Sequence, residues 1–142
     1  MVDKTILANK VAAVRDAVAR IASVLPSTPE EFRSNRTTRE VVTLNLFLAL
    51  QDCIGLATHW LADAGWGVPK SYGEVFMVLG ERGVLDEKLA LRLRSAAGLR
   101  NLIAHQYGVL DVDRIFVIAT SQRGDLLAFC EQLSQVAEAE SR

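Results

Sequence analysis

The sequence is poor in the residues on which many small folds depend. Its 142 residues include only two cysteines, three prolines and 6% aromatic side chains. Cys53 and Cys130 stand alone, outside any CxxC pair, which argues against a zinc site or a disulfide framework and favours reduced, buried thiols. Because prolines are few and Ala, Leu and Val dominate, the composition favours helices over a sheet.

Signals for export and for membrane insertion are also missing. Residues 1–20 carry charges every few positions and lack the continuous apolar core of a signal peptide. The most apolar region, residues 41–66, falls short of the roughly 18 uninterrupted apolar residues that a membrane span needs. Polar residues interrupt it, among them Asn45, Gln51, Asp52 and His59. We therefore expect a cytoplasmic protein with no membrane segment.

The net charge of the whole chain is close to zero, but the charged residues are unevenly distributed along the sequence. The formal net charge of −1 gives no global attraction for nucleic acid, so binding of that kind would need a local basic patch. One candidate patch exists, because residues 88–110 contain no Asp or Glu. Its basic residues are Lys88, Arg92, Arg94 and Arg100. An anion could be held there, and the first three are candidate RNA-binding residues.

The spacing of apolar residues predicts an all-α, up-and-down bundle of about five helices in one domain, residues 1–142. The expected helices cover residues 3–25, 38–64, 72–81, 87–105 and 112–137. Pro26 ends the first, and residues 26–35 are expected to form a loop. Asp86 and Asp111 are the expected N-caps of the last two helices, and Gly108 is the expected terminator of the fourth. The pattern leaves open whether Arg123–Gly124 breaks the last helix.

The expected helix 38–64 is apolar on more than one face. A helix of this kind is buried on two sides. A bundle of this size covers one side itself, and a second copy of the chain is the most economical cover for the other. The pattern therefore predicts a homodimer.

The fourth expected helix ends in a polar cluster, "GLRNLIAHQYG", at residues 98–108. On a helical wheel of about 100° per residue, the apolar residues of this helix form one core stripe, and Arg100 falls inside that stripe. His105 lies about 140° around the helix from Arg100. The stripe consists of Leu85, Leu89, Leu93, Ala96, Leu99 and Ile103. An arginine in such a stripe needs a partner. His105 shares its own face with Leu91, Ser95, Gly98 and Leu102, where small residues permit close approach by another helix.

Two interpretations of the cluster are open from spacing alone. In the structural one, Arg100 is a paired core arginine, His105 satisfies the last carbonyls of the helix, and Tyr107 is a packing aromatic. In the functional one, His105 removes a proton from a ribose 2′-hydroxyl while Arg100 stabilises charge on the attacked phosphate. Only two histidines occur, and HExxH, GxxxxGK[ST] and GxSxG motifs are absent, so no metal or cofactor is expected.

The cluster fits the pattern R-N-x-x-x-H-x-Y, which resembles the signature of HEPN-domain proteins of the HepT-like toxin family. The resemblance extends over about residues 38–118. It includes the long apolar helix with Asn45 and Gln51, the turn "GWGVPKSYGEVFMVLGERGVLD" and the segment "LRSAAGLRN". Many relatives differ by carrying acids at the positions of Gln51 and Gly55 and an arginine near Leu44.

The resemblance implies a dimeric helical bundle that acts as a metal-independent endoribonuclease, the toxin of a prokaryotic toxin–antitoxin pair. Arg100 and His105 would be the catalytic pair, supported by Asn101. The implied partner is a minimal, MntA-like nucleotidyltransferase antitoxin, which silences the toxin by transferring AMP to Tyr107. The departures at Gln51 and Gly55 motivate an alternative, an inactive binding module that only docks this partner. A third hypothesis is that Arg100 and Tyr107 help to bind nucleotide.

Overall fold

The computed structural model describes residues 3–105 and 111–140, and the side chains of residues 104 and 105 lie outside that description. The described ranges contain seven α-helices and no strand. They are α1 (Lys4–Val24), α2 (Pro29–Ser34), α3 (Arg36–Ala64), α4 (Tyr72–Glu81), α5 (Glu87–His105), α6 (Val112–Ser121) and α7 (Arg123–Glu140). The predicted all-α class is confirmed.

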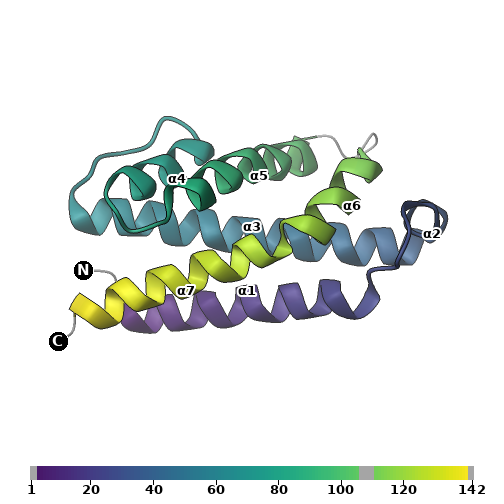
Figure 1. Ribbon diagram of the computed structural model, residues 1–142, viewed down its shortest axis with the longest axis horizontal. Helices are drawn as coiled ribbons and strands as arrows, with labels where there is room; N and C mark the ends of the chain where they lie inside the picture. Colours follow the sequence, from purple (N-terminus) through teal and green to yellow (C-terminus); the bar gives the residue numbers. More distant parts are fainter. Residues whose placement is uncertain (1–2, 106–110, 141–142) are drawn as a thin grey trace.

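The long helix α3 is the centre of the bundle and contacts all the other described helices. α1 and α7 lie along one side of it, and α4 and α5 lie along the other (Figure 1). α1 and α5 both run antiparallel to α3, and α2 and α6 close one end of the bundle (Figure 1). The C-terminal end of α5 therefore lies beside the N-terminal half of α3.

Capping residues fix most of the helix boundaries. The predicted caps Asp86 and Asp111 are confirmed: their carboxylates accept hydrogen bonds from the backbone N–H groups of Leu89 (3.1 Å) and Arg114 (3.0 Å). Asn35 caps α3 in the same way, which starts that helix at Arg36 rather than at residue 38. Gly108, the expected terminator of α5, lies outside the described residues.

The expectation of a loop at residues 26–35 is wrong, and the break that the sequence left open near Arg123–Gly124 does occur. The segment expected as a loop contains α2, which Thr28 caps and Pro29 begins, and whose Phe32 packs on Phe116 with ring centroids 5.3 Å apart. The last helix breaks, as the sequence allowed, and the break falls at Gln122, directly before Arg123. Short helices of this kind escape a search for long apolar periodicity because they bury few residues.

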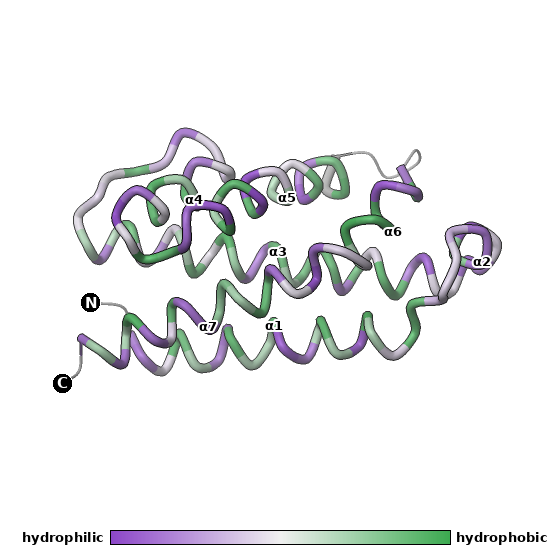
Figure 2. Tube along the Cα trace, in the orientation of Figure 1, coloured by the Kyte–Doolittle hydropathy of each residue, from purple (hydrophilic) through white to green (hydrophobic). Residues whose placement is uncertain are grey.

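The core lies between α3 and its neighbours. Figure 2 shows hydrophobic and hydrophilic residues alternating along the helices, as expected when each has one face in the core. The predicted core stripe of α5 is buried from Leu85 to Leu99, and Ile103 packs against it partly buried. By length and composition α3 could cross a membrane, but its buried residues, Leu46, Leu50 and Leu61 among them, belong to this core.

Helices α4 and α5 approach each other closely at two glycines. A Cβ at Gly80 would lie 2.9 Å from the Ala90 Cβ, and a Cβ at Gly73 would lie 3.1 Å from the Arg94 Cγ. Gly80 has no room for a side chain, whereas a Cβ at Gly73 would require only a small shift of the Arg94 side chain. These contacts hold the first turn of α4, which carries Tyr72, against α5.

The two cysteines are free and buried, as predicted. A hydrogen bond to the Cys130 thiol and burial together raise the pKa of the Cys53 thiol well above its ordinary value. Cys53 is therefore a protonated core side chain at neutral pH. The pair ties α3 to α7 within the core.

We expect Phe129→Ala to destabilise the bundle by about 3–5 kcal/mol, because it leaves a large cavity in a dense core. Phe129 is fully buried and packs edge-on against Phe76 at 5.5 Å between ring centroids. Urea unfolding followed by circular dichroism measures the loss. Val117→Ala, at a side chain that is 56% exposed, is the control and should change stability by less than about 0.5 kcal/mol. Similar losses for the two variants would contradict the assigned core.

Candidate functional site

Arg100 lies at the rim of the core, where α5 meets α3 and α4. Its Nε donates to Gln51 Oε1 at 2.8 Å, and its Nη1 donates to Asn101 Oδ1 at 3.2 Å. Its guanidinium carbon lies 4.7 Å from the ring centroid of Tyr72 and 5.5 Å from that of Phe47. The partners of this arginine are therefore two amides and two aromatic rings, with no ion pair to any described acid.

These contacts fix the guanidinium and leave part of it unused. The rings hold the cation by its face, and the amides hold two of its N–H groups. In the described part of the chain, no hydrogen bond involves Nη2. A guanidinium fixed in this way can offer its remaining N–H groups to a phosphate without losing further side-chain freedom.

His105 is the last residue of α5. It follows Arg100 by five residues, which places the two backbones about 7.5 Å apart along the helix axis and about 140° apart around it. One protomer thus presents the predicted catalytic pair on different sides of one helix. Tyr107, the predicted modification site, lies outside the described residues.

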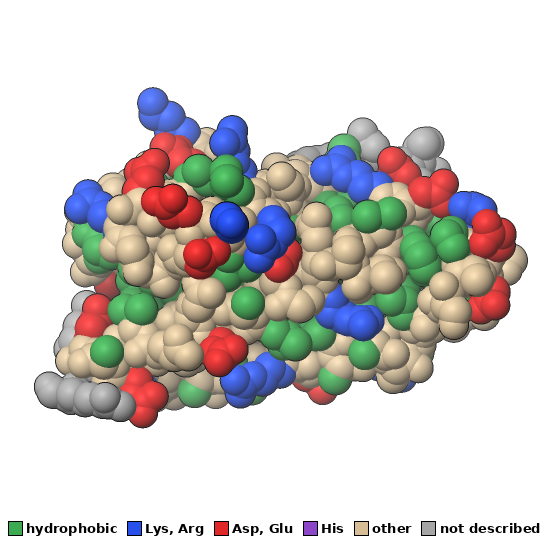
Figure 3. Space-filling model, in the orientation of Figure 1, with side chains coloured by type: hydrophobic (Ala, Val, Ile, Leu, Met, Phe, Trp, Pro, Cys, Tyr) green, Lys and Arg blue, Asp and Glu red, His purple; other side chains and the backbone are tan. Residues whose placement is uncertain are grey.

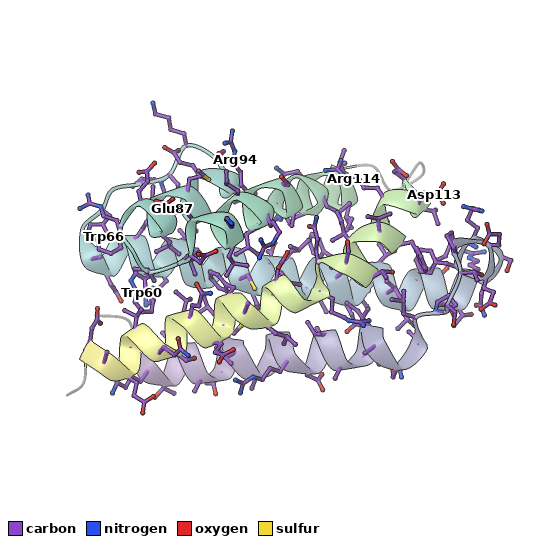
Figure 4. All side chains as sticks on the ribbon, viewed as in Figure 1. Trp60, Trp66, Glu87, Arg94, Asp113 and Arg114 are labelled. Carbon is purple, nitrogen blue, oxygen red and sulfur yellow. The ribbon has the colours of Figure 1, made fainter. Side chains whose placement is uncertain are left out.

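The face of α5 that includes His105 also carries basic groups. Arg94 precedes His105 by eleven residues, three turns, so the two share a face with Gly98 and Asn101. Arg114 reaches this face from α6: its Nη2 lies 3.7 Å from where a Cβ on Gly98 would be. In Figure 4, Arg94 and Arg114 lie along the same edge of the bundle. Arg114 escapes sequence-based prediction because nothing local links it to α5.

The predicted basic patch is divided by the structure. Lys88 and Arg92 are exposed on a flank of α5 that faces away from Arg94. Arg92 Nε lies 3.1 Å from both carboxylate oxygens of Asp125, so its charge is compensated within the fold. Basic and acidic side chains are also interspersed on the face in Figure 3. Of the predicted RNA-binding residues, Arg94 alone shares the face of His105.

A pocket of about 430 Å³ opens beside Arg100, between α3, α4 and α5. Its lining residues are Gln51, Ile54, Gly55, Thr58, His59, Ala62, Tyr72 and Arg100. From Arg100 it extends toward the C-terminal half of α3, whereas His105 lies in the opposite direction. No group of three or more His, Cys, Asp or Glu that could hold a metal ion occurs within residues 3–105 and 111–140.

An all-α bundle with an R-N-x-x-x-H-x-Y motif at the end of a helix defines the HEPN class. Within that class, the chain belongs to the family of HepT-like ribonucleases. The model of that family matches residues 14–133. The resemblance seen in the sequence is thereby confirmed.

Known relatives agree with this membership. The chain is 28% identical to the mRNA nuclease HepT of Shewanella oneidensis over 135 residues, which cover 95% of this chain and 98% of that one. It is 29% identical to the tRNA nuclease HepT of Aphanizomenon flos-aquae over 80 residues, 56% of this chain and 54% of that one. It also resembles the tri-AMPylated HEPN toxin of Shewanella oneidensis, solved in complex with its MNT antitoxin, with a TM-score of 0.83 and 27% identity over 95% of this chain and 99% of that one.

Proposed function

We propose that the chain is the ribonuclease toxin of a toxin–antitoxin pair and that it cleaves RNA without a metal ion. The observation that carries this proposal is the fixed guanidinium of Arg100, held by Gln51, Asn101 and two rings, on the helix that ends at His105. The HepT nucleases among its relatives support the same activity.

In the proposed reaction, His105 accepts the proton of a ribose 2′-hydroxyl, and the 2′-oxygen attacks the adjacent phosphorus. Arg100 donates hydrogen bonds to the phosphate oxygens on which negative charge grows. The bond to the 5′-oxygen breaks, and that oxygen takes up the proton that the His105 imidazolium received from the 2′-hydroxyl. The products are a 2′,3′-cyclic phosphate and a 5′-hydroxyl, so atoms and protons balance without a co-reactant.

A homodimer explains how both residues reach one phosphate. Because they lie about 140° apart on α5, an arginine of one protomer and a histidine of its partner can face a shared cleft more readily than the pair of one protomer. Helix α3 supports this assembly with an uncovered stripe at alternating spacings of four and three. It begins with Leu44 and Leu48, which are 57% and 45% exposed, and continues through Gln51, Gly55, Thr58 and Ala62.

The RNA backbone is proposed to follow the outer face of α5. Arg94 and Arg114 lie there and supply positive charge beside the face of His105. The cytoplasm, where RNA is present and thiols stay reduced, is the proposed compartment.

The direct test is cleavage of purified RNA by the purified chain in the presence of EDTA. We expect fragments with 2′,3′-cyclic phosphate ends, formed at the same rate with and without the chelator. A nuclease activity that EDTA abolishes would contradict the metal-independent mechanism.

The proposed partner is a minimal nucleotidyltransferase antitoxin that transfers AMP to Tyr107. Mass spectrometry after incubation with such a partner and ATP should show an increase by whole AMP units, together with loss of nuclease activity. In Tyr107→Phe the mass should stay unchanged, because the acceptor oxygen is missing. Tyr72→Phe is the matched control, and its mass increase should equal that of the wild type. AMP addition to Tyr107→Phe would place the modification elsewhere.

One observation favours a second candidate, an inactive module that docks the nucleotidyltransferase. Arg100 is oriented by the neutral amide of Gln51 and not by a carboxylate. This second hypothesis predicts a stable complex with the antitoxin and no loss of RNA, whichever residue occupies position 105. The RNA cleavage assay separates the two candidates.

A further inference from the structure

We propose that Tyr72 is a positioning residue of the ribonuclease, whose ring holds the Arg100 guanidinium in the orientation that the reaction needs. This inference rests on the proposed function, because it gives Tyr72 a part in the step that Arg100 carries out. Tyr72 lies on α4, outside the R-N-x-x-x-H-x-Y motif. Its ring centroid is 4.7 Å from the guanidinium carbon, closer than that of Phe47 at 5.5 Å. The contact thus links a helix that carries no motif residue to the proposed catalytic arginine.

Tyr72 belongs to a backbone that is fixed on both sides. Ser71, directly before it, caps α4 by accepting from the Glu74 N–H at 3.3 Å, and the Glu74 carboxylate accepts from a backbone N–H ahead of this cap at 2.6 Å. Gly73, directly after it, lies against α5, since a Cβ there would be 3.1 Å from the Arg94 Cγ. The ring therefore approaches Arg100 from a well-anchored turn of helix.

The Tyr72 ring contacts the arginine through its π face. The side chain is 40% exposed, so it does not belong to the core. Within residues 3–105 and 111–140, no hydrogen bond involves its hydroxyl. A guanidinium over an aromatic face is attracted by the ring quadrupole, and phenylalanine presents the same kind of face as tyrosine. Removal of the ring, but not of the hydroxyl alone, should therefore release Arg100.

The hydrogen bonds and the ring restrain the guanidinium in different directions. The bonds to Gln51 (2.8 Å) and Asn101 (3.2 Å) hold one edge of the group, which can still tilt about that edge. The Tyr72 ring, over which the guanidinium carbon lies, limits the tilt. A displacement of about 1 Å near a reacting group can cost about 100-fold in rate, whereas the positive charge that attracts RNA is unchanged. Loss of the ring should therefore slow the chemical step more than it weakens RNA binding.

The test compares Tyr72→Leu with Tyr72→Phe in single-turnover cleavage of a defined RNA. We expect Tyr72→Leu to lower the rate constant at saturating protein by about tenfold, while the protein concentration that gives half of this rate changes by less than about twofold. Tyr72→Phe keeps the ring and should recover the wild-type rate. An unchanged rate constant in Tyr72→Leu would overturn the proposal. A weaker half-saturation with an unchanged rate constant would also overturn it, because the ring would then contact RNA itself.

Two controls address indirect effects of the substitution. Trp66 makes the same kind of contact with Arg82, at 5.1 Å, at the opposite end of α4. Trp66→Leu should change cleavage by less than about twofold, and a loss equal to that of Tyr72→Leu would indicate general loosening of α4 and contradict the proposal. Light scattering should give Tyr72→Leu the oligomeric state of the wild type. A different state would assign the ring to a contact between protomers instead.

Combination with Arg100→Ala distinguishes a positioning role from a structural one. In the Arg100→Ala background, Tyr72→Leu should lower the cleavage rate by less than about a further twofold, because the group through which the ring acts is already missing. A structural role would lower the rate in both backgrounds alike. A further loss of about tenfold would therefore refute the positioning role.

A measurement that needs no cleavage separates this proposal from the proposed function. In NMR spectra, the Arg100 Nε–H, which is bonded to Gln51, should exchange with water several-fold faster in Tyr72→Leu than in the wild type or Tyr72→Phe. The Arg92 Nε–H, bonded to Asp125 at 3.1 Å, is the internal reference and should not change. Faster Arg100 exchange in a chain that cuts no RNA would refute the proposed function but retain the hold of the ring on Arg100. Unchanged exchange would refute that hold even in a chain that cuts RNA.

Discussion

His105→Ala should lower the rate of RNA cleavage by about 10²–10⁴-fold and abolish growth arrest when the chain is expressed without its antitoxin. The imidazole is the proposed acceptor of the 2′-hydroxyl proton, and no described histidine replaces it, since His59 lies on α3 on the far side of Arg100. Single-turnover cleavage of a defined RNA gives the rate, and growth after induction gives the cellular effect.

His59→Ala is the matched control for His105→Ala, because it removes the only other histidine of the chain. It should retain growth arrest and cleave RNA at close to the wild-type rate. Equal toxicity of the wild type and His105→Ala would remove His105 from the mechanism. Circular dichroism establishes that both variants keep the helical fold.

Arg100→Ala should lower the cleavage rate by about 10²–10³-fold, since it removes the group proposed to stabilise charge on the attacked phosphate. Arg100→Lys should recover little of this loss. A lysine keeps the charge, but it cannot donate to Gln51 and Asn101 at once and still present a planar N–H pair. The cleavage rate of the lysine variant therefore distinguishes the effect of a fixed guanidinium geometry from the effect of positive charge alone.

Arg92→Ala is the control for loss of a positive charge on α5. Arg92 is paired with Asp125 and lies on another flank of the helix, so cleavage should change by less than about twofold. If Arg92→Ala and Arg100→Ala lowered the rate equally, general electrostatic attraction would explain the effect, and the assignment of Arg100 to the reacting phosphate would be wrong.

Mixing the two inactive variants tests the shared cleft. If each site combines Arg100 of one protomer with His105 of its partner, a mixed dimer of Arg100→Ala and His105→Ala contains one intact site. Random exchange should then restore about a quarter of wild-type activity, since half of the dimers are mixed and each has one working site. No recovery would mean that each site uses both residues of one protomer.

The sequence was sufficient to predict the long helices because each buries an apolar face of many turns. The caps Asp86 and Asp111 and the core stripe from Leu85 to Leu99 follow from local chemistry and period. Helix α2 did not follow, because its six residues bury only Phe32 and its position depends on Phe116, far away in the sequence. Local patterns carry no information about such a contact.

In the candidate site, too, local features could be predicted from the sequence, whereas contacts between helices could not. The wheel identified Arg100 as an arginine in need of a partner but could not say which partner. Gln51, Phe47 and Tyr72 come from other helices, and only the packing of α3 and α4 against α5 brings them to the guanidinium. Likewise, the spacing of Lys88, Arg92 and Arg94 suggested one patch, whereas Asp125 compensates Arg92 from α7.

The contact at Gly80 limits which substitutions this sequence tolerates. Any residue larger than glycine at that position would push α4 away from α5 and carry Tyr72 with it, although Gly80 does not touch the guanidinium. A chain could thus lose its active geometry through a substitution that leaves every motif residue unchanged. Redesign of α4, or its transfer to another bundle, would have to retain Gly80 before the R-N-x-x-x-H-x-Y motif is a reliable indicator of nuclease activity.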